Sequence, residues 1–244
     1  MSPQARIRLG RTRVVPRSAA RWTGRFLARA ARELDLLLGP APLDGEVVLL
    51  GLRELPSSWK LDVCRPTGAS GHLEVIVYEC EGSCRPPWKE LATTVHEFVH
   101  HWIDHGSMLR GVVLPRWLED GTADTIAGHV VESLGGVVKD RPLPELSKPR
   151  SSLRDLLSWA APHGLPGPED IPRYDLAYHV VKEVWEKDDG KTLVRLLKAF
   201  AGREEVPPPE EQERIFEEVV GEPLEAVVAR LAARAPADGG RAER

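Results

Sequence analysis

Long apolar runs are missing from this sequence, and none approaches the ~20 residues that a membrane-spanning helix needs. No apolar stretch typical of a signal peptide follows the arginine-rich start. Cysteine is scarce as well, with three residues at Cys64, Cys80 and Cys84. An odd number argues against a disulfide framework, and the spacing of Cys80 and Cys84 is not the C-x-x-C of a zinc ribbon. We therefore expect a cytoplasmic protein with no membrane partner.

Acidic residues are absent from the first 32 positions, which hold nine arginines. A basic segment of this kind can bind an anionic partner such as nucleic acid. Aromatic residues interleave with these arginines only at Trp22 and Phe26, which is too few for a typical nucleic-acid surface. We favour a basic flexible tail over residues 1–17, followed by the solvated face of a helix. A protein recruited to nucleic acid through this arm remains an alternative.

The remaining composition is ordinary for a globular protein, with 42% hydrophobic and 29% charged residues. The periodicity predicts an amphipathic helix over residues 18–39 and short strands over 46–52 and 72–78. After residue 115 the pattern is helical almost throughout, apart from a stiff proline-rich linker in "EEVPPPEE". Strands early in the chain and helices later predict an α+β fold.

The predicted domain organisation follows from these patterns. It comprises the basic tail at 1–17, a subdomain with the small sheet at 18–135, a helical subdomain at 136–234 and a disordered tail at 235–244.

The segment "TTVHEFVHHWIDHG" carries the chemistry. It lies in a predicted helix of about 18 residues between Pro87 and Gly106, whose apolar face includes Leu91, Val95, Phe98 and Trp102. His96, Glu97 and His100 spell H-E-x-x-H. Residues four apart on a helix lie about 6 Å from each other on one face, so both imidazoles can bind one zinc ion. Glu97 lies beside them and can accept a proton from a zinc-activated water.

A catalytic zinc usually has three protein ligands, so a third is expected downstream. The segment "PRWLEDGTADTIAG" supplies acids. H-E-x-x-H followed by W-L-x-[acid]-G-x-A resembles the gluzincin clan of zinc metallopeptidases, which includes thermolysin and the zinc aminopeptidases. The resemblance implies a zincin-like fold, a Zn²⁺ cofactor and a peptide or protein substrate. The order of the later helical patterns is similar to that of small thermolysin-like domains.

Two acids compete for the third ligand position. The clan pattern aligns Asp120 with the ligand that is normally Glu, and leaves Glu119 at the variable position. Asp124 lies one helical turn after Asp120 and is placed to hydrogen-bond a ligating histidine, as the corresponding acid does in thermolysin. We therefore favour Asp120 and keep Glu119 as the alternative. Gly121 is expected to let the two zinc-binding helices approach.

Hydrolysis of an amide also needs a donor for the developing oxyanion. "IPRYDLAYHVVKEV" resembles the aminopeptidase helix whose opening tyrosine has this role, and Tyr174 holds the matching position. His101 and His105 do not complete a metzincin motif, which needs Gly at 103 and His at 106. We expect them to be solvated or to support the ligands, and we expect His179 and His163 to have core or surface roles.

The sequence therefore predicts a zinc peptidase. Zinc held by His96, His100 and Asp120 activates water, and Glu97 is the general base. The glycine-rich strand that aminopeptidases use is absent from "HLEVIVYECEGS", which favours an endopeptidase. An inactive zincin-fold binding scaffold, another zinc hydrolase and a nucleic-acid-associated protease remain as alternatives.

Overall fold

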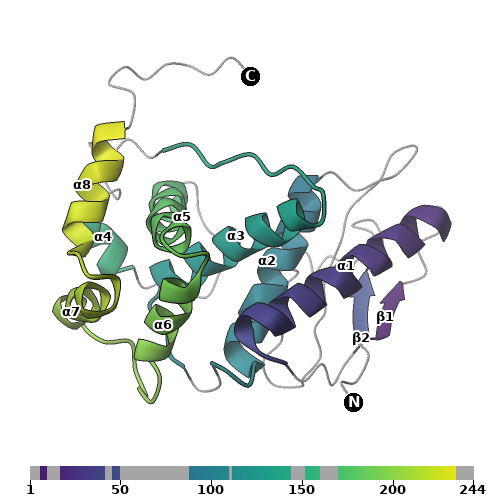
Figure 1. Cartoon of the computed structure of the whole chain (residues 1–244), viewed down its shortest axis with the longest axis horizontal. Helices are drawn as coiled ribbons and strands as arrows, with labels where there is room; N and C mark the ends of the chain where they lie inside the picture. The colour runs from purple at the N-terminus through teal and green to yellow at the C-terminus, as the bar shows by residue number, and fades with distance from the viewer. Residues whose placement is uncertain are drawn as a thin grey trace. The chain divides into compact units, whose positions relative to one another are not determined.

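The structure is a computed structural model, and it describes residues 6–9, 17–41, 46–49, 88–109, 112–143, 152–159 and 170–234. Most of these residues lie in helices (Figure 1). The helices are α1 (Arg17–Leu38), α2 (Trp88–His105), α3 (Arg116–Ser133), α4 (Leu153–Leu157), α5 (Ile171–Glu186), α6 (Lys191–Ala199), α7 (Pro209–Val220) and α8 (Leu224–Arg234).

The prediction of an α+β, zincin-like fold is wrong for the described residues, which are mostly helical. The strands are limited to β1 (Arg6–Leu9) and β2 (Glu46–Leu49), a parallel pair with Arg6 opposite Glu46. The described apolar faces are mainly stripes of helical period, and such stripes are buried by packing helix on helix. β2 begins where a strand was predicted, β1 lies inside the predicted tail, and the predicted strand at 72–78 is outside the described residues.

The chain divides into two compact units. The first comprises Met1–Val112 and Thr122–Lys139, and the second comprises Val113–Gly121 and Asp140–Arg244. The division passes through α3, which is one continuous helix with its first turns in the second unit. The predicted boundary between residues 135 and 136 stays a prediction.

In the first unit, α1 packs against α2. The predicted apolar face of α2 is buried, and Leu91, Val95 and Trp102 have no exposed surface. The indole Nε1 of Trp102 donates a hydrogen bond to Oδ1 of Asp35 on α1 at 3.0 Å. The side of α2 that carries this apolar stripe is therefore held against α1.

Helix α3 begins directly after Pro115, whose carbonyl accepts the backbone N–H groups of Leu118 and Glu119 at 2.9 and 3.1 Å. A proline before the first turn suits this position because proline has no N–H to satisfy. The middle of α3 is buried on nearly every side, and Asp120, Thr122 and Ile126 are each at most 1% exposed. Polar side chains in such a helix need partners inside the protein.

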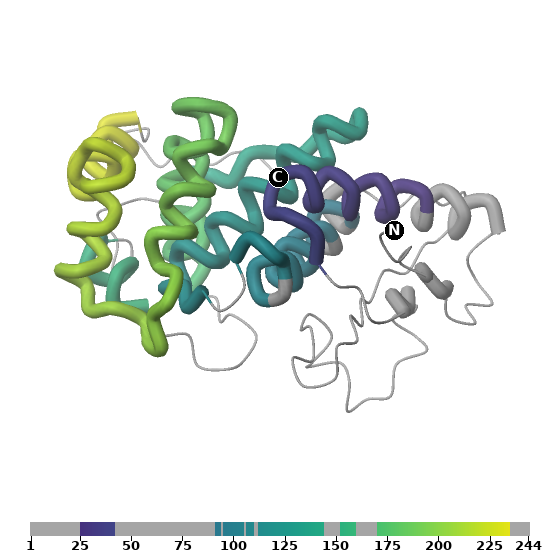
Figure 2. Tube along the Cα trace, turned by 60° about the horizontal axis from the view of Figure 1, so that its bottom comes forward, coloured from purple at the N-terminus to yellow at the C-terminus, as the bar shows by residue number. Residues whose placement is uncertain are grey.

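In the second unit, α5 is the central helix, and α4, α6 and α8 each pack against it (Figures 1 and 2). α7 packs in turn against α4, α6 and α8. The turn before α6 is tight, with Gly190 at a φ of 85° against the indole of Trp185. A Cβ at residue 190 would lie 2.5 Å from the Trp185 ring, so glycine is required there.

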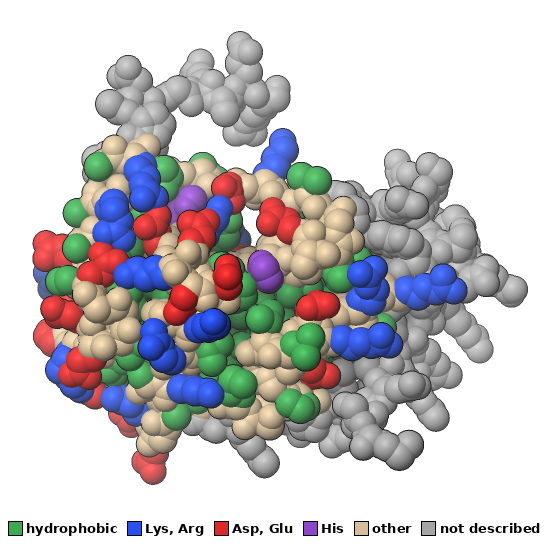
Figure 3. Space-filling view, viewed as in Figure 1, with side chains coloured by type: hydrophobic (Ala, Val, Ile, Leu, Met, Phe, Trp, Pro, Cys, Tyr) green, Lys and Arg blue, Asp and Glu red, His purple; other side chains and the backbone are tan. Residues whose placement is uncertain are grey.

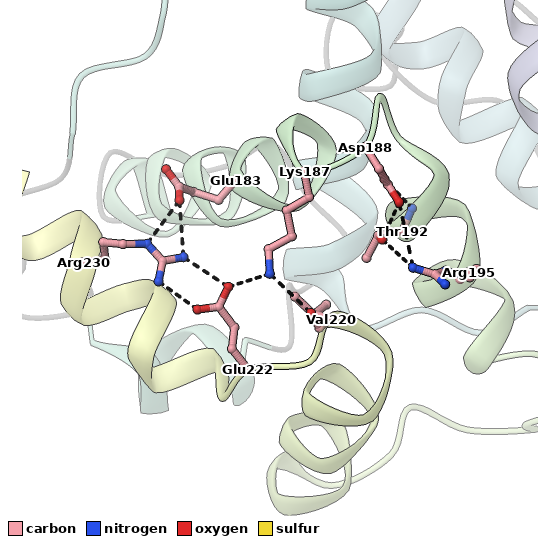
Figure 4. A network of polar contacts seen from close by, with 8 residues as sticks. All are labelled: Glu183, Lys187, Asp188, Thr192, Arg195, Val220, Glu222 and Arg230. Atoms are coloured by element: carbon pink, nitrogen blue, oxygen red, sulfur yellow. Dashed lines mark hydrogen bonds and ion pairs between the residues drawn. The ribbon is translucent and has the colours of Figure 1, made fainter.

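A polar network joins α5, α8 and the turn that precedes α8 (Figure 4). Arg230 of α8 contacts Glu183 of α5 and Glu222 of the turn, and Lys187 forms an ion pair with Glu222 at 2.6 Å. On the face that Figure 3 presents, the acidic and basic side chains of the described residues are interspersed. Among the described helices, none has the length and apolar character that crossing a membrane requires.

Candidate metal centre

Two imidazoles on α2 face each other at the predicted motif. His96 and His100 are one helical turn apart, and their Nε2 atoms lie 3.0 Å from each other. Their rings meet edge to face, with centroids 4.7 Å apart and an angle of 72° between the planes. The two ring nitrogens therefore converge on one point, as two ligands of one ion do.

Helix α3 supplies the acid. Three potential ligand atoms, one from each of His96, His100 and Asp120, all lie within 4.8 Å of one another. Asp124, one turn further along α3, contacts His96 within the first unit. Asp120 and Asp124 are carried by the same helix, one turn apart.

The hydrogen bond predicted for Asp124 is present: its Oδ1 lies 2.8 Å from Nδ1 of His96. A carboxylate accepts and does not donate, so Nδ1 of His96 carries the proton. The lone pair of this imidazole then belongs to Nε2, the nitrogen that faces His100. The contact therefore selects the tautomer that can bind a metal ion.

The potential metal ligands and Asp124 are largely shielded from solvent. Asp120 is 1% exposed and His100 is 9% exposed, while Asp124 and His96 are half-buried. A buried carboxylate is costly without a cationic partner. Arg116, one turn earlier on α3, forms an ion pair with Asp120 through its Nε atom.

Arg116 also contacts the predicted oxyanion donor. Its Nη2 atom donates to the hydroxyl of Tyr174, at the start of α5, at 3.0 Å. Burial raises the pKa of Tyr174, and the charge of Asp120 adds to this effect, whereas the contact with Arg116 opposes it. The phenol is therefore protonated at neutral pH, as a hydrogen-bond donor must be.

The role expected for Gly121 needs correction. A Cβ at this position would lie 2.6 Å from the carbonyl oxygen of Ala177 and 2.7 Å from Cγ2 of Val181. Both contacts are with α5, so Gly121 lets α3 approach α5, whereas we expected it to serve the approach of the two zinc-binding helices. Tyr174 belongs to the same α5, and the glycine therefore helps to place the tyrosine beside α3.

The two other acids of the motifs lie on the same helices. Glu97 follows His96 on α2 and is half-buried, and Glu119 precedes Asp120 on α3. Glu119 is not a member of the group of potential ligands found among the described residues. The structure thus assembles the favoured set, with Asp120, and leaves the choice of ligand as a prediction.

The other histidines are placed differently from one another. We expected His101 to be solvated or to support the ligands. It is 2% exposed and lies edge to face against Trp102, so the first expectation is wrong and the second stays a prediction. His101 follows His100 by one residue, which is about 100° around the helix, and its ring therefore faces a different direction from that of His100. Nε2 of His179 lies 2.9 Å from the carbonyl oxygen of Arg141, which gives it a structural role. The side chain of His105 and all of His163 are outside the described residues.

The donor set fits zinc. Two imidazole nitrogens and one carboxylate match the arrangement of catalytic zinc sites, and one imidazole is already oriented by an acid.

Sequence reasoning missed Arg116, although the i, i+4 spacing of Arg116 and Asp120 is visible in "RWLED" and is typical of a helical ion pair. It also missed Trp159, which lies far from the motifs in sequence.

Comparisons of this chain with protein-family models, with curated proteins and with solved structures gave no match.

Proposed function

We propose that this protein is a zinc-dependent peptidase, and that His96, His100 and Asp120 hold the ion. The observation that carries the proposal is the convergence of these three side chains on one point, with a carboxylate already bonded to Nδ1 of His96. Buried or half-buried donors of this kind favour zinc over Mg²⁺ or Ca²⁺, which prefer sites made of oxygen ligands. Zinc at this site supplies a Lewis acid, which polarises a carbonyl and lowers the pKa of water towards ~7.

Glu97 is the proposed general base. It lies next to His96 on α2 and is half-buried, so its carboxylate can act close to the ion without binding it. It accepts the proton that the attacking water loses and delivers it to the leaving amine. An endopeptidase is the favoured form of this activity, because the glycine-rich strand of the aminopeptidases is absent from the sequence.

Tyr174 is the proposed oxyanion donor. Arg116 donates to its oxygen, so the phenol proton points towards another acceptor. Burial keeps this proton on the oxygen at neutral pH by raising the pKa of the hydroxyl. Donors of this type typically contribute ~10²–10³ in kcat.

The proposal is tested with Glu97→Gln in the full chain, with metal content and peptide hydrolysis measured on the same sample. We expect one zinc per chain in both proteins and loss of hydrolysis in the variant. Glu132→Gln, a matched change at an exposed position in the last turn of α3, controls for the loss of a carboxylate. If Glu97→Gln hydrolyses peptides as fast as the wild type, Glu97 is not the base.

A binding scaffold is the second candidate, and the Asp at a position that is normally Glu favours it. Stoichiometric zinc together with no cleavage in a broad peptide library would support the scaffold over the peptidase.

We also propose a cytoplasmic location for the protein, and this proposal rests on the small, odd number of cysteines.

A further inference from the structure

Arg116 makes contacts with three side chains that surround it in the second unit. Its Nε atom is paired with Oδ2 of Asp120, and its Nη2 atom donates to the hydroxyl of Tyr174 at 3.0 Å. Its Cζ atom lies 5.9 Å from the centre of the Trp159 ring. One guanidinium therefore touches the proposed acid ligand, the proposed oxyanion donor and an aromatic side chain.

We propose that Arg116 is a positioning residue of the metal centre, which fixes the Asp120 carboxylate and the Tyr174 hydroxyl relative to each other. This inference rests on the proposed function for the roles of those two groups. The contacts themselves do not depend on the proposed function. All of the residues concerned belong to the second unit.

The surroundings of this contact distinguish it from an ordinary surface ion pair. The side chains of Asp120 and Arg116 are 2% and 32% exposed, and Trp159 is 5% exposed. Surface ion pairs contribute little because water screens them and because their side chains are mobile. Here burial reduces the screening, and contacts on several sides restrict the guanidinium.

Trp159 completes the arrangement. Its ring meets that of Tyr174 edge to face, with centroids 4.6 Å apart. The tyrosine is thus held at two points, its ring by Trp159 and its oxygen by Arg116. A phenol held in this way presents its proton in a restricted range of directions, as an oxyanion donor must.

Arginine is suited to this role in a way that lysine is not. The guanidinium is planar and its N–H groups have fixed directions, so one side chain can contact Asp120 through Nε and Tyr174 through Nη2 at the same time. Lysine has one ammonium group on a flexible stem and would contact one acceptor well. The charge alone would be conserved by Arg116→Lys, but the link between Asp120 and Tyr174 would be lost.

The experiment uses the full chain with Arg116→Ala and Arg116→Lys. The matched control is Arg173→Ala, which removes the arginine next to Tyr174 that pairs with Asp170 at 2.8 Å. Zinc affinity is measured by competition with a chromophoric chelator. Ionisation of Tyr174 is measured in the metal-free protein by absorbance at alkaline pH, and Tyr174→Phe identifies its signal among the three tyrosines.

We expect Arg116→Ala to weaken zinc binding by roughly 10-fold or more, the usual effect of removing a partner of a ligand. The Tyr174 titration should move to higher pH, because the donor to its oxygen is lost. Arg116→Lys should restore only part of either property, and Arg173→Ala should change neither.

Unchanged zinc affinity and an unchanged Tyr174 titration in Arg116→Ala would overturn the inference. Full restoration of both by Arg116→Lys would also overturn it, because charge without the two-point contact would then suffice. A wild-type chain that binds no zinc would overturn the proposed function instead. The shift of the Tyr174 titration in metal-free Arg116→Ala would in that case still support the contact of Arg116 with Tyr174.

Discussion

Nδ1 of His96 and Oδ1 of Asp124 lie 2.8 Å apart and join α2 to α3 by a side-chain contact across 28 positions of sequence. The contact does two things at once. It directs the lone pair of His96 towards Nε2 of His100, and it engages the helix that also carries Asp120. The geometry of the proposed centre therefore depends on a residue that is not itself a proposed ligand.

Asp124→Ala should weaken zinc binding by about 10- to 100-fold, because His96 loses the acceptor that orients its ring. Asp124→Asn keeps an oxygen acceptor at the same distance and should have a smaller effect. Competition with a chelator measures both affinities. Equal affinity in the wild type and in Asp124→Ala would show that the orientation of His96 does not depend on this carboxylate.

The identity of the acid ligand can be decided with a matched pair of variants. Asp120→Asn should lose stoichiometric zinc, whereas the neighbouring Glu119→Gln should retain it, because Asp120 alone of the two belongs to the group of potential ligands. Metal analysis of the purified variants gives the answer. The opposite result would assign the ligand to Glu119 and would leave Asp120 as the partner of Arg116.

The local features were predictable from sequence. Helix α2 occupies Trp88–His105 as the spacing of its apolar residues indicates. The contact of Asp124 with a histidine is present, as the place of Asp124 one turn after Asp120 and the resemblance to thermolysin led us to expect. The extent of α2 depends on positions within one helix, whereas the contact of Asp124 joins two helices and was expected from the resemblance to the gluzincin clan. Both features survive even though the predicted fold class does not.

The remaining features depend on which elements meet, and a single sequence does not contain this information directly. Gly121 signals a close approach, but only the structure identifies α5 as the neighbouring helix. Trp159 and Tyr174 come from separate segments of the chain and meet at the guanidinium of Arg116. The predicted fold class was wrong because helices bury most of the described apolar surface, although β2 begins where a strand was predicted.

Gly121→Ala should destabilise the protein. Alanine favours a helix over glycine by about 1 kcal/mol, but the added Cβ would lie 2.6 Å from the backbone oxygen of Ala177, and overpacking typically costs about 1–3 kcal/mol. The net loss should be up to about 2 kcal/mol. Denaturant unfolding of the metal-free protein measures it without a contribution from zinc binding.

Gly128→Ala on the same helix is the matched control. Beyond the adjoining residues and backbone of α3 itself, no atom of the described residues lies within 4 Å of a Cβ built at residue 128. The helix preference therefore decides, and the variant should gain up to about 1 kcal/mol. The two glycines should thus give changes of opposite sign. A stabilised Gly121→Ala would show that α3 and α5 are not in close contact at this point.

The network around Glu222 predicts an acid-dependent contribution to stability. Hydrogen bonds from Arg230 and then from Lys187 lower the pKa of Glu222 from 4.5 to about 2 (Figure 4). The unfolded chain therefore takes up this proton at a higher pH than the folded protein does. The contribution is present above pH 4.5 and is lost as the pH falls towards 2.

Glu222→Gln should therefore lower the free energy of unfolding by about 1 kcal/mol at neutral pH, and the difference from the wild type should shrink below pH 4.5. Glu218→Gln is the control, because Glu218 is 61% exposed and its ion pair with Arg214 runs along α7. A pair of that kind contributes at most ~0.5 kcal/mol. Denaturant unfolding at several pH values separates the two, and a Glu222→Gln effect that is independent of pH would mean that the network does not hold this carboxylate in its charged form.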